Sequence, residues 1–152
     1  MTESRYFRYP NLRGDLLTFV ADDDVWLAPA AGGRAWRISA DRAQAAGPKF
    51  SGDGSQVAWT SWRDGPPEIY LASTDGGDTA RVSYWSNQST RLRGWNPEGE
   101  ILATDIRVAI WSFRYDPSGS VRGNLPATVS GGCPCPGSSF LSNPAWYLAP
   151  IG

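Results

Sequence analysis

The chain has 152 residues, of which 41% are hydrophobic and 12% aromatic, enough apolar material for the core of one globular domain. Fourteen basic residues nearly balance fifteen acidic ones, and no segment carries a basic stripe, so nucleic acid and anionic membranes are not expected partners. Histidine is absent, which excludes Ser-His and Cys-His nucleophilic pairs and imidazole metal sites within this chain.

The N-terminal residues 1–8 are polar, and no apolar core follows them. The longest apolar runs anywhere in the chain are four or five residues. Neither a secretory signal nor a membrane-spanning segment fits this pattern, and we therefore expect a cytoplasmic protein.

The first strand is predicted over Tyr6 to Asn11, with Pro10 placing it at a sheet edge. Asp15 to Val20 follows as a strand that is apolar on both faces, with Leu17 and Phe19 on one of them. Sheets that are covered on both sides show this pattern.

The stretch from Gly54 to Ser83 reads as three strands joined by turns rich in Gly and Pro, and an earlier copy of it lies 44 positions upstream. Nine positions match in one register, pairing Val25, Trp26, Leu27, Ala28, Gly32, Gly33, Arg37, Ile38 and Ser39 with Ile69, Tyr70, Leu71, Ala72, Gly76, Gly77, Arg81, Val82 and Ser83. The preceding strand matches at 40 positions, Gly14 with Gly54, so the intervening hairpin absorbs the difference.

A third copy begins at Gly94 to Gly99, 45 positions after the second, and continues through Thr104. A period of 40 to 45 residues with several short strands per unit is typical of β-propeller blades. The sequence therefore predicts an all-β fold of about two to two and a half four-stranded antiparallel blades, at 6–40, 47–85 and 91–104. In such an array the tryptophans are expected between blades rather than stacked on a ligand; they are Trp26, Trp36, Trp59, Trp62, Trp85 and Trp95.

From Asp105 the blade pattern fades, and no charged residue follows Arg122. We expect residues 105–152 to form an irregular tail rich in Gly, Pro and Ser, and one hypothesis is that they are translated out of frame. The Tyr115 to Gly119 segment imitates the repeat turn but comes too early in the chain, so coincidence is the preferred interpretation. Val108 to Phe113 is nevertheless apolar enough to join a sheet.

No residue of the sequence is assigned a catalytic, cofactor-binding or metal-binding role. Cys133 and Cys135 are too close for an easy disulfide, and no further Cys or His completes a metal site. Asp22 to Asp24 is interpreted as a hairpin turn rather than a cation site. Three serines of the repeats lack a base that would activate them as nucleophiles; they are Ser51, Ser61 and Ser83.

The turns Phe50 to Gly54 and Trp95 to Gly99 resemble the Phe-Ser-Pro-Asp-Gly turns of TolB-like, oligopeptidase and tricorn propellers. A narrower resemblance covers residues 5–104 and points to the N-terminal region of the tricorn protease family. It is carried by five segments, Tyr9 to Asp15, Leu17 to Val20, Asp23 to Trp26, Arg81 to Trp85 and Gly94 to Trp95.

The resemblance implies a cytoplasmic, homo-oligomeric serine protease that degrades oligopeptides, with a six-bladed N-terminal propeller that gates or channels them. In that family a PDZ domain and a C-terminal catalytic domain carry the Ser and His, so no active-site residue transfers to this sequence. Expected partners are peptides and the missing remainder of the propeller and protease. A stand-alone interaction module and a non-functional remnant remain as alternatives. An open ring end is also expected to leave the isolated chain marginally stable or self-associating.

Overall fold

In the computed structural model, the described residues are 6–104, 110–115 and 121–124. All regular structure in these ranges is β, which confirms the predicted fold class. The strands are β1 (Arg8–Arg13), β2 (Leu16–Ala21), β3 (Asp24–Pro29), β4 (Trp36–Arg37), β5 (Ala45–Phe50), β6 (Gln56–Ser61), β7 (Glu68–Ser73), β8 (Ala80–Arg81), β9 (Arg91–Trp95), β10 (Ile101–Thr104), β11 (Ile110–Tyr115) and β12 (Val121–Asn124).

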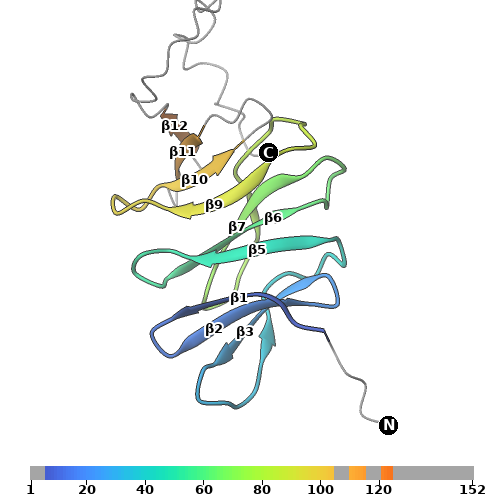
Figure 1. Cartoon of the computed structure of the whole chain (residues 1–152), viewed down its shortest axis with the longest axis vertical. Coiled ribbons are helices and arrows are strands. Elements are labelled where there is room, and N and C mark those ends of the chain that lie inside the picture. The colour runs from blue at the N-terminus through green and yellow to red at the C-terminus, as the bar shows by residue number, and fades with distance from the viewer. Residues whose placement is uncertain (1–5, 105–109, 116–120, 125–152) are drawn as a thin grey trace, which may run out of the picture.

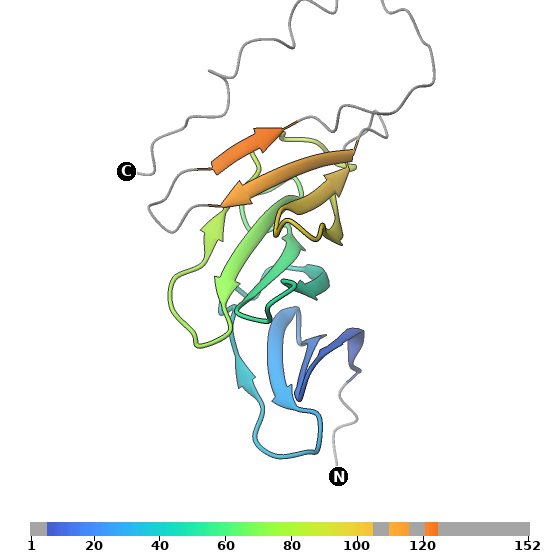
Figure 2. The same ribbon diagram turned by 90° about the vertical axis from the view of Figure 1, so that its left-hand side faces the viewer.

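The strands form three antiparallel sheets, in the orders β1-β2-β3-β4, β5-β6-β7-β8 and β9-β10-β11-β12. Each strand therefore pairs with its neighbour along the chain, as in a propeller blade. We call the sheets blades 1, 2 and 3. They lie face to face in succession (Figure 1), and the turned view shows the same succession (Figure 2). The sheets do not close into a ring, as expected of an incomplete propeller.

The third sheet extends beyond the predicted end of the repeat at Thr104. β11 pairs along β10 from Phe113 opposite Ile101 to Ile110 opposite Thr104, and β12 pairs with β11 in turn. The expectation of an irregular segment directly after Thr104 thus has to be corrected for these two strands. The exposed edge of β10 offers unpaired backbone groups, and an apolar run without the turn signature is enough to fill it. Residues 125–152, with Cys133 and Cys135, lie outside the described residues.

The turn between β2 and β3 is four residues shorter than the turn between β6 and β7, which agrees with the change of repeat offset from 40 to 44 positions. Asp22 and Asp23 alone link β2 to β3, with φ angles of 52° and 64°. Two successive positive φ angles are typical of the tight hairpin turn whose twist matches its strands. Blade 2 replaces this turn with the longer 62–67 segment between β6 and β7, while the strand pairing on either side is retained.

The core consists of two clusters, one at each junction between blades. The cluster between blades 1 and 2 contains Val20, Val25, Leu27, Ala45, Phe50, Val57, Trp59, Tyr70 and Ala72. The cluster between blades 2 and 3 contains Ala58, Ile69, Leu71, Val82, Leu92, Ile101 and Ala103, with Trp85 and Trp95 packed against it. In each blade the leading face is the one turned toward the preceding blade, and the trailing face is turned toward the following one.

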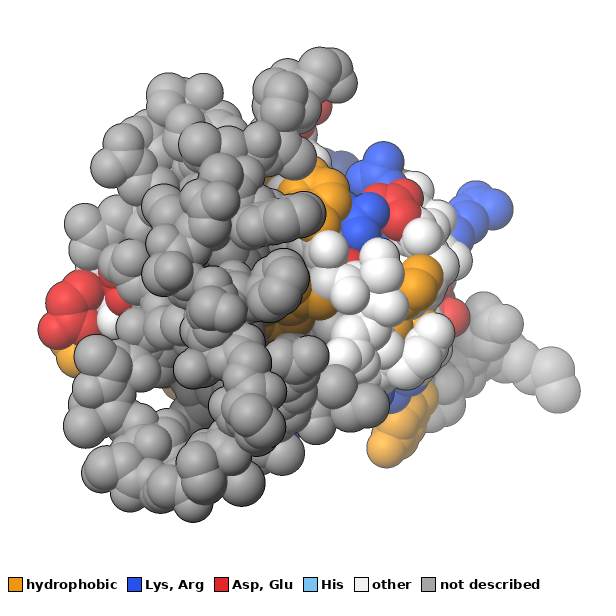
Figure 3. Space-filling model, turned by 90° about the horizontal axis from the view of Figure 1, so that it is seen from above, with side chains coloured by type: hydrophobic (Ala, Val, Ile, Leu, Met, Phe, Trp, Pro, Cys, Tyr) orange, Lys and Arg blue, Asp and Glu red, His pale blue; other side chains and the backbone are white. Residues whose placement is uncertain are grey.

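The tryptophans only partly follow the prediction of packing between blades. Trp59 is buried in the first cluster, and Trp85 and Trp95 pack against the second. Trp36, by contrast, is exposed. Figure 3 views the molecule from the blade 3 end, where hydrophobic side chains of described residues reach the surface beside charged ones.

Candidate functional site

The first strands of the three blades lie beside one another, β1 against β5 and β5 against β9 (Figure 1). Where these strands end, their last residues and the turns that follow surround an open groove with a volume of about 380 Å³. This volume lies within the range of small-ligand sites in proteins. The lining residues are Asn11, Leu12, Arg13, Lys49, Phe50, Ser51, Gly52, Gly94, Trp95, Asn96 and Pro97.

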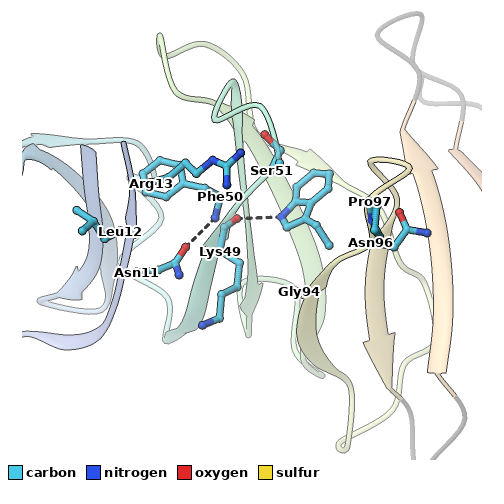
Figure 4. A pocket seen from close by; sticks show the side chains of 11 residues that line it. Asn11, Leu12, Arg13, Lys49, Phe50, Ser51, Gly94, Asn96 and Pro97 are labelled. Carbon is cyan, nitrogen blue, oxygen red and sulfur yellow. Dashed lines mark hydrogen bonds between the residues drawn. The ribbon is translucent and has the colours of Figure 1, made fainter. Parts of the chain in front are cut away.

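Two hydrogen bonds between blades fix the spacing of the groove walls. The backbone N–H of Phe50 donates to Asn11 Oδ1 at 3.0 Å, and Trp95 Nε1–H donates to the carbonyl oxygen of Lys49 at 3.0 Å (Figure 4). Each bond satisfies a backbone group of β5 that faces a neighbouring blade. The groove is therefore a property of three adjacent blades and not of any single one.

The charge of the groove is positive. Arg13 and Lys49 are its charged residues, and none of the lining side chains is acidic. Figure 4 shows the Arg13 side chain extending past Phe50 toward Ser51, while the Lys49 side chain points the other way. Arg13 is thus the cation that is directed along the groove, and it is exposed to solvent.

The Asp53 carboxylate lies near the groove and accepts hydrogen bonds from residues of its own turn. Asp53 accepts hydrogen bonds from the Ser51 hydroxyl at 2.6 Å and from the Ser55 N–H and hydroxyl at 3.1 and 2.8 Å. These bonds, that from Ser51 foremost, lower the pKa of Asp53 from 3.8 to about 2. Gly54 closes the turn with φ +80°, and Arg13 Cγ lies 3.5 Å from where a Cβ would stand. A residue with a side chain would be strained there by the positive φ, while its Cβ would make only an ordinary van der Waals contact with Arg13.

The corresponding turn of blade 3 is held by a different pair of side chains. Asn96 Oδ1 accepts the N–H of Glu100 at 2.7 Å, and Asn96 Nδ2 donates to the Glu100 carboxylate at 2.9 Å. Gly99 has the same positive φ as Gly54, at 78°. The two turns therefore share a Gly with positive φ, as predicted, but each is held by a different set of side-chain hydrogen bonds.

The serines considered as nucleophiles hold backbone and carboxylate groups. Ser51 Oγ accepts the N–H of Gln56 at 3.0 Å, and Ser61 Oγ accepts the N–H of Arg63 at 3.2 Å. Ser83 donates to the buried carboxylate of Glu68.

The Asp22 to Asp24 segment forms the hairpin turn that the sequence predicted, and its carboxylates have protein partners. Asp23 pairs with Arg8 at 2.7 Å. Asp24 is buried and accepts hydrogen bonds from Ser39 Oγ at 2.9 Å and from Arg37 at 3.1 Å. Within the described ranges no group of three or more His, Cys, Asp or Glu side chains is placed to hold a metal ion. The same ranges contain no helix long and apolar enough to span a membrane.

Sequence reasoning missed the buried carboxylates of Asp24 and Glu68. The two residues are 44 positions apart, which is the offset of the repeat. Because one is Asp and the other Glu, the match of nine positions at that offset did not include them. The matched pair Ser39 and Ser83 at the same spacing was the available signal.

Comparison with known proteins gives a consistent result for most of the chain. The family described as the tricorn protease N-terminal β-propeller domain matches residues 4–126. Tricorn protease homolog 1 of Streptomyces coelicolor is 50% identical over 98 residues, which are 64% of this chain and 9% of that protein. The chain thus spans about a tenth of the length of this relative. The family match continues past Asp105, where the blade pattern in the sequence fades.

A shorter relative and a solved structure complete the comparison. A protein of Sulfurisphaera tokodaii, named as a tricorn-like protease N-terminal subunit, is 33% identical over 117 residues, which cover 72% of this chain and 59% of that one. The crystal structure of the tricorn protease superimposes with a TM-score of 0.65 at 20% identity, over 71% of this chain and 12% of that one. The structural likeness concerns the fold.

Proposed function

The chain belongs to the family of tricorn protease N-terminal β-propeller domains, and we propose that it supplies the first blades of a tricorn-like serine protease that degrades oligopeptides. Its part in this activity is non-catalytic, because a chain without histidine lacks the base of a Ser-His pair. The same proposal places the complete enzyme in the cytoplasm as a homo-oligomer, in keeping with the family resemblance.

The observation that carries the proposal is the groove across β1, β5 and β9. It joins the three blades at the same end of their first strands, so a peptide lying across the blades would contact all three. We propose that this groove guides oligopeptides toward catalytic domains elsewhere in the complete protein.

Arg13 supplies the chemistry for recognising a peptide. Its guanidinium extends along the groove, and a guanidinium binds a carboxylate through two parallel hydrogen bonds. A short peptide always carries a carboxylate at its C-terminus, whatever its sequence. Recognition through Arg13 is therefore expected to be independent of peptide sequence and dependent on the free C-terminus.

Fluorescence anisotropy with a labelled oligopeptide tests this role on the full chain. Arg13→Ala is expected to weaken binding about tenfold, because an exposed charge-assisted hydrogen bond contributes at the lower end of about 1.5–3 kcal/mol. Arg34→Ala is the matched control, since Arg34 is an exposed arginine outside the groove. Amidating the peptide C-terminus is expected to reproduce the loss. Equal binding by both variants and by both peptides would contradict the proposal.

A second candidate is a separately encoded propeller subunit that binds a partner protein. The observation in its favour is the relative named as an N-terminal subunit, of which this chain matches 59%. Mixing the chain with a tricorn homologue that lacks its first three blades distinguishes the two roles. A stable complex with restored peptidase activity is expected of a subunit, and its failure to form would contradict that role.

A further inference from the structure

Three aspartates of the chain are each followed directly by glycine, and they are Asp53, Asp64 and Asp75. All three are exposed to solvent and lie in turns of blade 2. An Asp-Gly pair can rearrange without an enzyme, because glycine has no side chain to hinder the attack of its backbone nitrogen on the carboxyl carbon of the aspartate. What distinguishes the three pairs is how each carboxylate is held.

Two of the three carboxylates are fixed by hydrogen bonds. Asp53 accepts the three bonds from its own turn that were described above. Asp64 Oδ2 accepts the hydroxyl of Tyr70 at 2.6 Å and the guanidinium of Arg81 at 3.3 Å. Hydrogen bonds to an ionised acceptor are among the stronger ones in proteins. Each of these carboxylates has to give up such bonds before its carbon can turn toward the next backbone nitrogen.

The Asp75 carboxylate is held by no such bond. Within the part of the chain that the structure describes, it accepts no hydrogen bond and forms no ion pair. The hydrogen bond that Asp75 does make uses its backbone N–H, which donates to Ser73 Oγ at 3.2 Å. A Cβ placed on Gly76 would meet no heavy atom within 4 Å apart from its chain neighbours, so there is room for a ring to close beside Gly76.

The turn that contains Asp75 does not depend on the aspartate side chain. At the repeat offset of 44 positions, blade 1 has Ala31 and Gly32 where blade 2 has Asp75 and Gly76. In both turns the N–H of this glycine donates to the carbonyl oxygen three residues earlier, at 3.0 Å in blade 1 and 3.2 Å in blade 2. Both glycines have a φ of 94°. The same turn therefore forms with alanine, and the Asp75 carboxyl group is left available for reaction.

We propose that Asp75 is a site of spontaneous conversion to isoaspartate. The backbone nitrogen of Gly76 bonds to Asp75 Cγ, and one carboxyl oxygen leaves as water together with the amide hydrogen and the carboxyl proton. The product is a cyclic imide. Water then adds to one of its two carbonyl carbons and the ring opens. Opening at the main-chain carbonyl gives isoaspartate, and opening at Cγ restores aspartate. One water is released and one is consumed, so the conversion needs no oxidant or reductant.

Isoaspartate at this position alters the connection between β7 and β8. The main chain then passes through the former side chain, which adds one carbon atom to the backbone of the turn. β8 pairs with β7 at two positions, through Ala80 and Arg81. The modified chain is therefore expected to lose pairing of β8 and to unfold at a lower urea concentration. The inference is independent of the proposed function, because Asp75 does not line the groove.

Peptide mapping of the full chain after prolonged incubation in warm neutral buffer tests the site. Trypsin cuts after Arg63 and Arg81, so Asp64 and Asp75 fall in the same peptide and are compared within it by electron-transfer fragmentation. Isoaspartate at Asp75 is expected to exceed that at Asp53 or Asp64 at least about tenfold, because the other two carboxylates must first break a charge-assisted hydrogen bond. Similar amounts at all three sites, a larger amount at Asp53 or Asp64, or none at any site would overturn the proposal.

Two variants test the reason for the difference. Asp75→Ala reproduces the alanine of blade 1, so it should fold like the unchanged chain and lose the modification at this turn. Tyr70→Phe removes one of the bonds to Asp64 while Arg81 still holds the carboxylate. This variant is expected to raise isoaspartate at Asp64 about threefold or more relative to Asp53, which serves as the reference for any general loosening of blade 2. An unchanged ratio would contradict protection by hydrogen bonding.

Discussion

Ser83 donates its hydroxyl hydrogen to the carboxylate of Glu68, a side chain that is fully buried at the start of β7. The same serine accepts the backbone N–H of Ile69 at 2.9 Å. Ser39 and Asp24 repeat the arrangement in blade 1, 44 positions earlier. In blades 1 and 2 a serine thus ties the third strand to the segment that follows the fourth strand, and a carboxylate accepts a hydrogen bond from that serine.

Removal of the Glu68 carboxylate is expected to unfold blade 2 first. The Glu68 carboxylate accepts hydrogen bonds from Arg81 at 3.0 Å and from the Ser86 N–H at 2.7 Å. Glu68→Ala leaves the Ser86 N–H and the Ser83 hydroxyl without this acceptor, while Arg81 keeps its ion pair with Asp64 at 3.3 Å. The expected loss is about 2–6 kcal/mol of unfolding free energy, at about 1–3 kcal/mol for each unpaired donor, measured by urea unfolding with tryptophan fluorescence. Asp75→Ala, an exposed carboxylate of the same blade, should change stability by less than about 0.5 kcal/mol. Equal effects of the two substitutions would refute this role of Glu68.

Thr18 and Thr60 are both buried, and replacing each by valine is expected to change the unfolding free energy in opposite directions. Among the described residues, Thr18 Oγ1 is the one buried side-chain polar atom without a hydrogen-bond partner. Thr18→Val removes this unpaired group and is expected to raise the unfolding free energy by about 1 kcal/mol. Thr60 Oγ1 instead accepts the N–H of Leu92 at 2.9 Å, across the junction of blades 2 and 3. Thr60→Val should therefore lower stability by about 1–3 kcal/mol. Urea titrations that moved both variants in the same direction would contradict the pairing.

Asp53 is predicted to make the groove turn sensitive to acid. The pKa of Asp53 is about 2 in the folded chain against 3.8 ordinarily, so folding favours the ionised form. The resulting stabilisation is present above pH 4 and declines as the pH falls toward 2. Its size is modest, because the carboxylate is exposed to water. Asp53→Asn should be less stable than the unchanged chain at pH 6, with the difference shrinking between pH 4 and pH 2. If the stability difference between the Asp53→Asn variant and the unchanged chain did not vary with pH, the predicted role of the ionised Asp53 carboxylate would be contradicted.

Trp95 is predicted to hold blade 3 against blade 2 through its indole. Trp95→Phe loses the bond from Nε1 to the Lys49 carbonyl oxygen and should cost about 0.5–1.5 kcal/mol. It should also weaken peptide binding, because Trp95 forms one wall of the groove. Trp36→Phe, on an exposed tryptophan of β4, is the control and should alter neither property. If Trp95→Phe lowered stability without changing peptide binding, the indole would not contribute to binding in the groove.

The repeated segments made blades 1 and 2 predictable. Turn glycines such as Gly54 and Gly99 and strand residues such as Leu71 recur in register, and both turns form as expected. Blade 3 was predicted only in part, because β11 and β12 pair by backbone hydrogen bonds that the edge of β10 offers to many sequences. The residue types in a strand therefore predict this kind of edge pairing only weakly.

The groove was not predictable from the sequence, because its walls come from three blades. Arg13, Lys49 and Trp95 lie far apart in the chain, and no spacing rule joins them. The packing of blade on blade brings them together. The exposure of Trp36 escaped prediction for the same reason, since hydrophobic patterning does not say which face has a neighbour.

A crystal structure of the 152-residue chain tests the central claim most directly, because the groove and the buried carboxylates both depend on how the sheets are arranged. The account predicts three four-stranded meanders in succession, with Asn11 bonded to Phe50 and Trp95 bonded to Lys49 between neighbouring first strands. Two sheets packed as a sandwich, or first strands that do not lie beside one another, would contradict it.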